Sequence, residues 1–304
     1  MAIETEAREQ TLANSEVTPG TFADNLLHLA EQLEMPGPPE SAPAPQAVPP
    51  KPQAAPETQL EPEPAADLAR DEAPDAYAPP ELDAIACRRT FPVLNPQCTR
   101  EYLEQFRALR TRLCLEQRNW SLRQHDLRVV AVLSPSAGDG RSFVAANLAA
   151  SLAVSDAQVL LVDVNTAAPS LHNRLDVPSV PGLTEALQGP RGLANQAWWT
   201  TLRRVPECNL FTMTLGAGGA TAIDTVDLQK LPALIEHWRH CFDWVILDGP
   251  AFEVTSDAEI LSEIADASVL VIRPGKTLFS EAQRSVSRMP AGRVLGIVMN
   301  PRPA

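Results

Sequence analysis

Residues 129–142 read VVAVLSPSAGDGRS, and this stretch decides the fold. It begins with a short apolar run, continues through a loop of small residues that contains Gly138 and Gly140, and enters an Ala- and Leu-rich segment at 141–154. Small residues let backbone N–H groups approach a phosphate chain, and the amino end of a helix favours its negative charge. The order of strand, loop and helix therefore predicts a phosphate-binding loop.

One residue of this loop departs from the usual motif. The candidate nucleotide-binding residues are Gly138, Asp139, Gly140, Arg141, Ser142 and Phe143. A Ser that closes such a loop can hold Mg²⁺ through its hydroxyl. The usual motif has Lys at position 141, whereas Arg carries its charge on a wider, planar group that does not reach between the terminal phosphates with the same geometry. A structural turn between strand and helix is the alternative interpretation of the loop alone.

Further apolar runs follow along the chain and alternate with helical segments. The expected strands are 129–134, 158–163, 209–214, 243–248, 268–272 and 293–299, and the expected helices are 141–154, 182–188, 227–240 and 277–288. Strands that are apolar throughout are typical of a parallel sheet buried on both sides. The sequence therefore predicts an α/β fold, a mostly parallel sheet with helices on both faces, whose ligand site lies at the carboxyl ends of the strands.

Two acids end strands of this expected sheet. Asp163 closes the run LLVD, and Asp248 closes the run VILD. A phosphate loop together with two acids at strand ends is a layout for metal-assisted phosphoryl transfer. We therefore take Arg141, Asp163 and Asp248 as the catalytic candidates, and Ser142 with the two acids as candidate ligands of Mg²⁺.

The first 90 residues differ in composition from the rest. They hold 17 acids, 5 bases and 15 of the 29 prolines, whereas residues 91–304 hold 21 acids and 20 bases. Pro, Ala and Glu bury too little apolar surface to offset chain entropy. We expect residues 1–90 to be a disordered acidic tail with a short helix at 21–34, and residues 91–304 to be the folded domain.

The composition also excludes several classes. The body carries no basic domain of the kind that binds nucleic acid, and no apolar run approaches the roughly 20 residues of a membrane-spanning helix. The first residues lack the pattern of a secretory signal. The five cysteines are odd in number and widely spaced, which supports neither a disulfide framework nor a zinc site. These features indicate a cytoplasmic protein.

Over about residues 99–300 the chain resembles the bacterial tyrosine kinases (BY-kinases) of polysaccharide export, members of the MinD/ParA-like branch of P-loop ATPases. Their three nucleotide motifs are matched by SAGDGRS, VDVN and LDGPA, and their E-x-x-R-x-x-R helix by residues 104–110. The resemblance implies ATP or ADP with Mg²⁺ as cofactors, and Asn300 near the nucleotide base. It also implies a homo-oligomer, a ring in which Glu104 of one subunit meets Arg107 or Arg110 of the next.

The departures from the family pattern fall largely on polar residues. Arg141 replaces the loop Lys, Asn165 replaces the second acid of D-x-D, and Ala167 and Ala168 replace two basic residues. Ala251 replaces a Pro, and after Asn300 only PRPA follows, without the family's Tyr-rich tail. The apolar framework is retained, which suggests a fold kept while the chemistry was relaxed, as in a pseudokinase.

Three functions remain open at this point. The first is a divergent BY-kinase-like protein of exopolysaccharide biosynthesis or export, weakly active or inactive, and regulatory. Its expected partners are a membrane-bound polysaccharide co-polymerase and a paralogous kinase, the first of which would hold it at the inner membrane. The second is an active tyrosine kinase or ATPase in which Arg141 acts for Lys. The third is a MinD/ParA-like positioning ATPase, although those proteins carry an extra Lys where this chain has Ser136.

Overall fold

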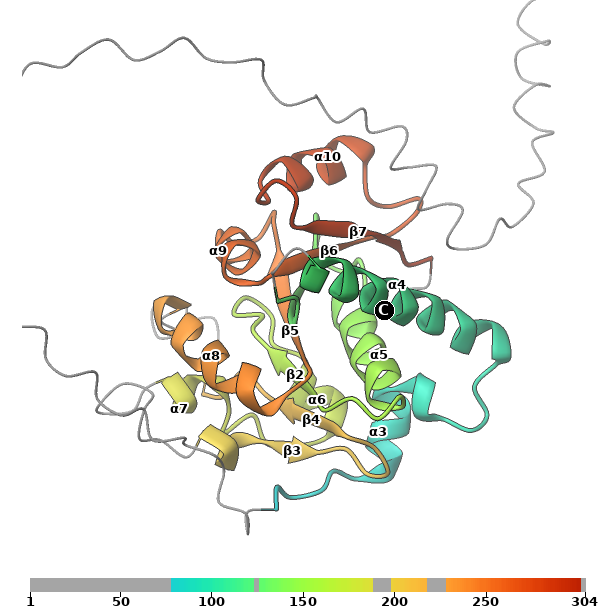
Figure 1. The fold of residues 1–304 in the computed structure, drawn as a ribbon, viewed down its shortest axis with the longest axis vertical. Coiled ribbons are helices and arrows are strands. Elements are labelled where there is room, and N and C mark those ends of the chain that lie inside the picture. Colours follow the sequence, from blue (N-terminus) through green and yellow to red (C-terminus); the bar gives the residue numbers. More distant parts are fainter. Residues whose placement is uncertain (1–77, 123–125, 188–197, 218–227, 302–304) are drawn as a thin grey trace, which may run out of the picture. The chain divides into compact units, whose positions relative to one another are not determined.

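The computed structural model describes residues 78–122, 126–187, 198–217 and 228–301 (Figure 1). The expected tail up to residue 77, with its short helix at 21–34, lies outside the described residues. The described chain forms one α/β unit that includes the candidate phosphate loop.

Within the described residues, seven strands form one sheet in the order β3-β4-β2-β5-β1-β6-β7. Their bounds are β1 Val129–Ser134, β2 Val159–Asp163, β3 Arg203–Arg204, β4 Leu210–Met213, β5 Trp244–Ala251, β6 Ala267–Ile272 and β7 Val294–Met299. All neighbours are parallel except β3 and β4, which are antiparallel. The predicted fold class is thus confirmed.

Helices cover both faces of the sheet, with α5 (Arg141–Ala153) and α4 (Arg100–Leu122) on one side and α8 (Leu231–Cys241) and α9 (Asp257–Ile264) on the other (Figure 1). Every residue of β1, β2 and β5 is buried, which explains why these strands are apolar throughout. The remaining helices are α3 Ala84–Thr90, α6 Leu171–Leu175, α7 Leu183–Leu187 and α10 Phe279–Ser287; short 3₁₀ turns occupy Pro92–Leu94, Trp198–Thr201 and Leu228–Lys230.

Helix α5 is buried on almost every side, which accounts for its small residues. The sheet lies against one side and α4 against the other, and residues 144–153 are all buried. Near its start, the ring of Phe143 contacts the rings of Tyr102 and Phe106 of α4, with centroids 6.1 and 6.3 Å apart. This aromatic cluster fixes the first turn of α5, directly after the phosphate loop, against a second helix.

The folded unit begins earlier than the sequence suggests. Helix α3 precedes residue 91, the expected start of the domain, and is capped by Asp83, whose carboxylate accepts the backbone N–H groups of Ile85 and Ala86. Thr90 donates its hydroxyl to the carbonyl of Arg174, and the Phe91 side chain is fully buried. Since these contacts join residues far apart in the chain, α3 is part of the core.

Besides α3 and α6, two described elements were not expected from the sequence. Strand β3 has two residues, too few for an apolar pattern, and it pairs at the edge of the sheet with β4. Helix α9 has eight residues and follows the turn after β5. Within the described residues, no helix combines the length and the apolar character that a bilayer crossing requires.

We predict that a chain beginning at residue 78 unfolds at the temperature of the full-length protein. A chain beginning at residue 91 should unfold several degrees lower, because it loses the buried side chains Leu82, Ala86 and Cys87. Thermal unfolding followed by circular dichroism measures both. Equal melting temperatures for the two truncated chains would show that α3 contributes nothing to the core.

Candidate functional site

The phosphate loop runs from Pro135 to Gly140, between the end of β1 and the start of α5. Gly138 and Gly140 have φ angles of 81° and 91°, in the left-handed region that favours glycine. At Gly140 space is also restricted: an added Cβ would lie 1.9 Å from the side-chain nitrogen of Asn300. Asn300, at the end of β7, donates that N–H to the carbonyl of Asp139 over 3.1 Å. The structure thus brings Asn300 to the loop.

Arg141 turns its guanidinium toward the end of β1. Its Nη1 donates to the hydroxyl of Ser134 over 2.7 Å, and that hydroxyl donates to the carbonyl of Ser136 over 2.7 Å. Arg141 is 9% exposed, and burial lowers its pKa while the nearby acids, Asp248 foremost, raise it. The cation that replaces the usual Lys therefore ties the base of the loop to the strand.

Asp163 ends β2 and is fully buried. One oxygen of its carboxylate accepts the backbone N–H of Asn165, and the other accepts those of Ser170 and Leu171, each over 3.0 Å. Burial raises the pKa of this carboxyl, and the three backbone N–H groups oppose that rise. Asp163 therefore organises the chain between β2 and α6.

Asp248 lies beside Asp163, because β2 and β5 pair in parallel with these two residues in register. Burial, with the nearby carboxyl of Asp163, raises the pKa of Asp248 to about 7. The hydroxyl of Ser142 and the guanidinium groups of Arg141 and Arg174 oppose the rise. The structure thus assembles Ser142 and both acids, the three candidate metal ligands, at the carboxyl ends of two strands.

Asn165, which stands at the second acid of D-x-D, is committed to the backbone. Its side-chain amide donates to the carbonyl of Ala168 over 2.9 Å and accepts the N–H of Ala168 over 3.2 Å. The side chain is 3% exposed. An amide therefore closes the turn at 165–168, where the family pattern would place a charged carboxylate.

Sequence reasoning missed two charged residues at the loop. Glu253, just after β5, accepts the N–H of Ala137 over 2.6 Å and the hydroxyl of Ser136 over 2.9 Å, and the first of these bonds lowers its pKa. Lys276, after β6, donates to the carbonyl of Ala137, and its Nζ lies 3.5 Å from the carboxylate of Asp139. Both follow strands at their carboxyl ends, but neither closes an apolar run as the two buried acids do.

The three predicted oligomerisation residues differ in their contacts within the chain. Glu104 and Arg107 form an exposed pair within one helix turn, 3.4 Å apart. Arg110 donates to the carbonyl of Ser151 near the end of α5 over 2.9 Å. Arg110 therefore joins α4 to α5 within the chain, while Glu104 and Arg107 lie at the surface.

The buried polar atoms of the site fit a nucleotide with Mg²⁺. Among the described residues, Oδ1 of Asp248 and Nε of Arg141 are buried and have no hydrogen-bond partner. A carboxylate oxygen suits Mg²⁺, and a guanidinium N–H suits a phosphate oxygen. In the same ranges no group of three or more His, Cys, Asp or Glu could hold a metal, so a site here would have to rest on fewer acids, with the Ser142 hydroxyl.

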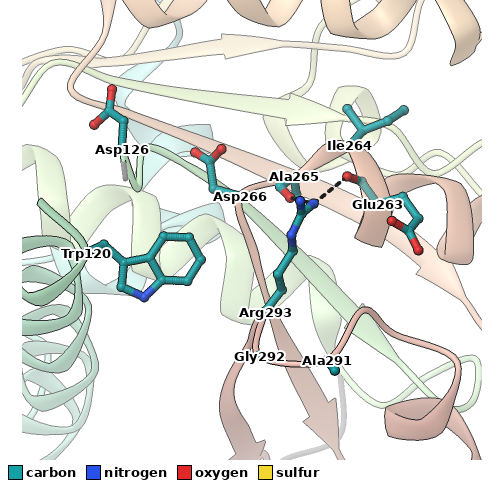
Figure 2. Close-up of a pocket in the computed structure, with 9 residues that line it drawn as sticks. All are labelled: Trp120, Asp126, Glu263, Ile264, Ala265, Asp266, Ala291, Gly292 and Arg293. Carbon is teal, nitrogen blue, oxygen red and sulfur yellow. Dashed lines mark hydrogen bonds between the residues drawn. The ribbon is translucent and has the colours of Figure 1, made fainter. Parts of the chain in front are cut away.

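A pocket of about 500 Å³ lies at the opposite ends of the strands from the phosphate loop (Figure 2). Asp126 and Asp266 precede β1 and β6, and Arg293 precedes β7, so the pocket is at the amino ends of these strands. Arg293 donates to the carbonyl of Glu263 over 2.7 Å. In a parallel sheet the ligand site is expected at the carboxyl ends of the strands, which are opposite to this pocket. The chemistry of the phosphate loop does not involve this pocket.

No family model matches the chain, but curated relatives do. It is 28% identical over 222 residues to the tyrosine-protein kinase ptk of Acinetobacter johnsonii, covering 72% of this chain and 29% of that one. It is also 28% identical over 199 residues to the tyrosine-protein kinase YwqD of Bacillus subtilis (strain 168), covering 65% of this chain and 80% of that one. Both of these relatives are bacterial tyrosine-protein kinases. The resemblance seen in the sequence is confirmed.

One relative carries the name of a polysaccharide system. The succinoglycan biosynthesis transport protein ExoP of Rhizobium meliloti (strain 1021) is 31% identical over 180 residues, covering 57% of this chain and 22% of that one. The chain thus spans less than a third of the Acinetobacter and Rhizobium proteins. The solved kinase domain of Escherichia coli tyrosine kinase ETK has the same fold, with a TM-score of 0.59 and 23% identity over 77% of this chain and 85% of that one.

We predict that Asp248 makes stability fall as pH rises. Because its pKa is raised to about 7, the folded protein holds this proton more tightly than the unfolded chain does. The stabilising contribution is full below the unfolded pKa of about 4 and is lost as pH rises through about 7. Urea unfolding at pH 5 and pH 8 should show a smaller loss of unfolding free energy in Asp248→Asn than in wild type.

The control is Asp176→Asn, the same change at an exposed position. It should keep the wild-type dependence on pH. An Asp248→Asn variant that loses as much stability as wild type between the two pH values would contradict the prediction.

Proposed function

We propose that the chain is a nucleotide-binding, BY-kinase-like protein of exopolysaccharide biosynthesis or export, with weak or no phosphotransfer of its own and a regulatory role. One observation carries the proposal. The guanidinium of Arg141 is 9% exposed and bonded to the hydroxyl of Ser134 at the end of β1. A cation held there contributes less to a developing charge on a terminal phosphate than one aimed at it.

Nucleotide binding is supported by the parts of the site that remain. The loop keeps its two left-handed glycines. The N–H groups of Ser136 and Ala137 are bonded to Asp139 and Glu253, which leaves those from Gly138 onward for a phosphate chain. Ser142 and Asp248 would hold Mg²⁺, and Asn300 closes the loop from β7. The metal would neutralise phosphate charge when bound.

Weak catalysis is supported by the way two polar side chains are used. The side-chain amide of Asn165 is hydrogen-bonded to the backbone of Ala168, and both oxygens of Asp163 accept backbone N–H groups. A general base needs an oxygen within reach of the proton that it removes. The side chains of Asn165 and Asp163 are instead hydrogen-bonded to the backbone, which makes proton removal by either of them less favourable.

The second candidate function is an active kinase or ATPase that uses Arg141. One observation favours it: Nε of Arg141 is buried and has no partner among the described residues. A phosphate oxygen would satisfy this N–H. The third candidate, a positioning ATPase, has less support, because Ser136 stands where those proteins carry an extra Lys and its hydroxyl is bonded to Glu253.

Partners and location complete the proposal. In the Acinetobacter and Rhizobium relatives the matched region is 29% and 22% of a longer chain, and in the Bacillus relative it is 80%. The same region thus occurs both joined to other sequence and nearly alone. We propose that a membrane-bound polysaccharide co-polymerase is a partner and holds the protein at the inner face of the membrane, and that a paralogous kinase is a second partner.

Titration with ATP and ADP, with and without Mg²⁺, followed by a turnover assay, tests the nucleotide proposal. We expect wild type to bind nucleotide and to turn over ATP near background. Arg141→Lys should tighten Mg-ATP by about tenfold, equivalent to ~1.4 kcal/mol, because the ammonium reaches the terminal phosphates. Arg141→Lys with Asn165→Asp should recover some turnover, and Asp248→Asn should abolish any that is present.

Robust turnover in wild type that falls in Arg141→Lys would overturn the inactive assignment and establish Arg141 as an adapted catalytic group. A wild-type protein that binds neither nucleotide under any of these conditions would overturn the binding proposal itself. Thermal unfolding of each variant separates these results from loss of the fold.

Self-association through α4 is tested best at Arg107. If Glu104 of one subunit meets Arg107 of the next, Arg107→Glu places like charges across the interface and lowers the mass seen by analytical ultracentrifugation. Arg110→Glu is a poorer probe, because Arg110 also bonds the carbonyl of Ser151 within the chain.

The matched control is Arg112→Glu on the same helix. Arg112 is similarly exposed and pairs with Glu116 at 2.8 Å. It should leave the mass unchanged. Equal masses for wild type and Arg107→Glu across a range of concentrations would remove the ring hypothesis.

A further inference from the structure

Lys276 lies at the mouth of the phosphate loop, although it comes from a different part of the chain. Its Nζ contacts the carbonyl of Ala137 and is 3.5 Å from the carboxylate of Asp139. A methyl group built on Gly138 would lie 3.1 Å from the same nitrogen. Lys276 thus contacts Ala137 and Asp139 and lies next to the open side of Gly138 between them, at the positions where a phosphate chain would approach the backbone.

The turn that carries Lys276 is anchored at its base. The backbone N–H of Arg273 donates to the hydroxyl of Thr277 over 2.9 Å, and the N–H of Lys276 donates to the carbonyl of Arg273 over 3.0 Å. Next to it, the N–H of Asn300 donates to the carbonyl of Ile272 over 2.8 Å. These bonds hold the turn at the carboxyl end of β6, beside the loop.

The charges around the loop make this cation necessary. Four acids surround the site: Asp139, Asp163, Asp248 and Glu253. Arg141, Arg174 and His172 are basic groups near them, and Arg141 is buried against Ser134. Asp139 is fully buried, so its negative charge would repel a phosphate unless a cation lies between them.

Exposure distinguishes Lys276 from Arg141. The Lys276 side chain is 42% exposed, whereas Arg141 is 9% exposed. An ammonium carries three donors on a flexible stem, so Lys276 can keep its contact with the loop and still donate to an arriving oxygen. The two residues thus divide the tasks that one Lys usually performs. Arg141 bonds the loop to the end of β1, and Lys276 places an exposed charge at the mouth of the loop.

We propose that Lys276 is a phosphate-binding residue of this site, the cation that contacts the nucleotide's phosphate chain in place of the loop lysine. This inference rests on the proposed nucleotide binding and identifies the residue on which it depends. It predicts that Lys276 contributes to affinity beyond its neutralisation of Asp139.

A double-mutant cycle separates these two contributions. Mg-ATP affinity is measured on the full chain for wild type, Lys276→Gln, Asp139→Asn and the double variant. Lys276→Gln should weaken binding by about tenfold or more, because it removes a charged donor to a phosphate oxygen. In the Asp139→Asn background, Lys276→Gln should still weaken binding several-fold. The matched control, Lys230→Gln at an exposed position near the start of α8, should bind as wild type does.

A second measurement needs no variant. The chain has three lysines, Lys51, Lys230 and Lys276, so acylation by an amine-reactive reagent can be followed at each by mass spectrometry. Mg-ATP should slow acylation of Lys276 several-fold and leave that of Lys230 unchanged. This result does not depend on the stability of any substituted protein.

The outcomes are distinguishable. If wild type fails to bind Mg-ATP, the proposed function fails, and this inference falls with it. If wild type binds Mg-ATP but the Asp139→Asn protein is insensitive to Lys276→Gln, or if acylation of Lys276 is not slowed, the inference alone is wrong. Tighter binding by Lys276→Gln would also overturn it, since Lys276 would then block the loop.

Discussion

Two buried carboxylates, Asp163 at the end of β2 and Asp248 within β5, lie in register on neighbouring parallel strands, and the organisation of the site follows from their proximity. Like charges this close in a buried place cannot both ionise without compensation. Asp163 is compensated by three backbone N–H groups, which fix the path of the chain into α6. Asp248 is compensated by the hydroxyl of Ser142 and by Arg141, which connect it to the phosphate loop.

Most of the sheet could be predicted from the sequence, because buried parallel strands are continuous apolar runs. The expected strand at 129–134 matches β1, and the runs that end in Asp163 and Asp248 are β2 and β5. The α3 helix was placed in the tail, since its sequence follows a long Pro-rich stretch and its burial depends on contacts with distant residues such as Arg174. Such contacts leave no local pattern.

The candidate site was predicted in part for the same reason. The loop and the acids of the apolar runs have a local sequence pattern, and the structure assembles them on the side of the sheet where the strands have their carboxyl ends. The direction in which a side chain points has no local sequence pattern. The sequence reveals that Arg141 replaces Lys, but the bond of Arg141 to Ser134 follows from the packing of the loop. Lys276 and Glu253 were missed because a single charge in a loop normally indicates solvent exposure.

The contact between Gly140 and Asn300 constrains how this protein can evolve. A Cβ at position 140 would overlap the Asn300 side chain, which is bonded to the carbonyl of Asp139. Residue 140 therefore meets two constraints, because a side chain there would overlap Asn300 and would also have to adopt a φ of 91°, in the region that favours glycine. A change at residue 300 alone would lose the bond between β7 and the loop but would not release residue 140, although the two positions are 160 residues apart.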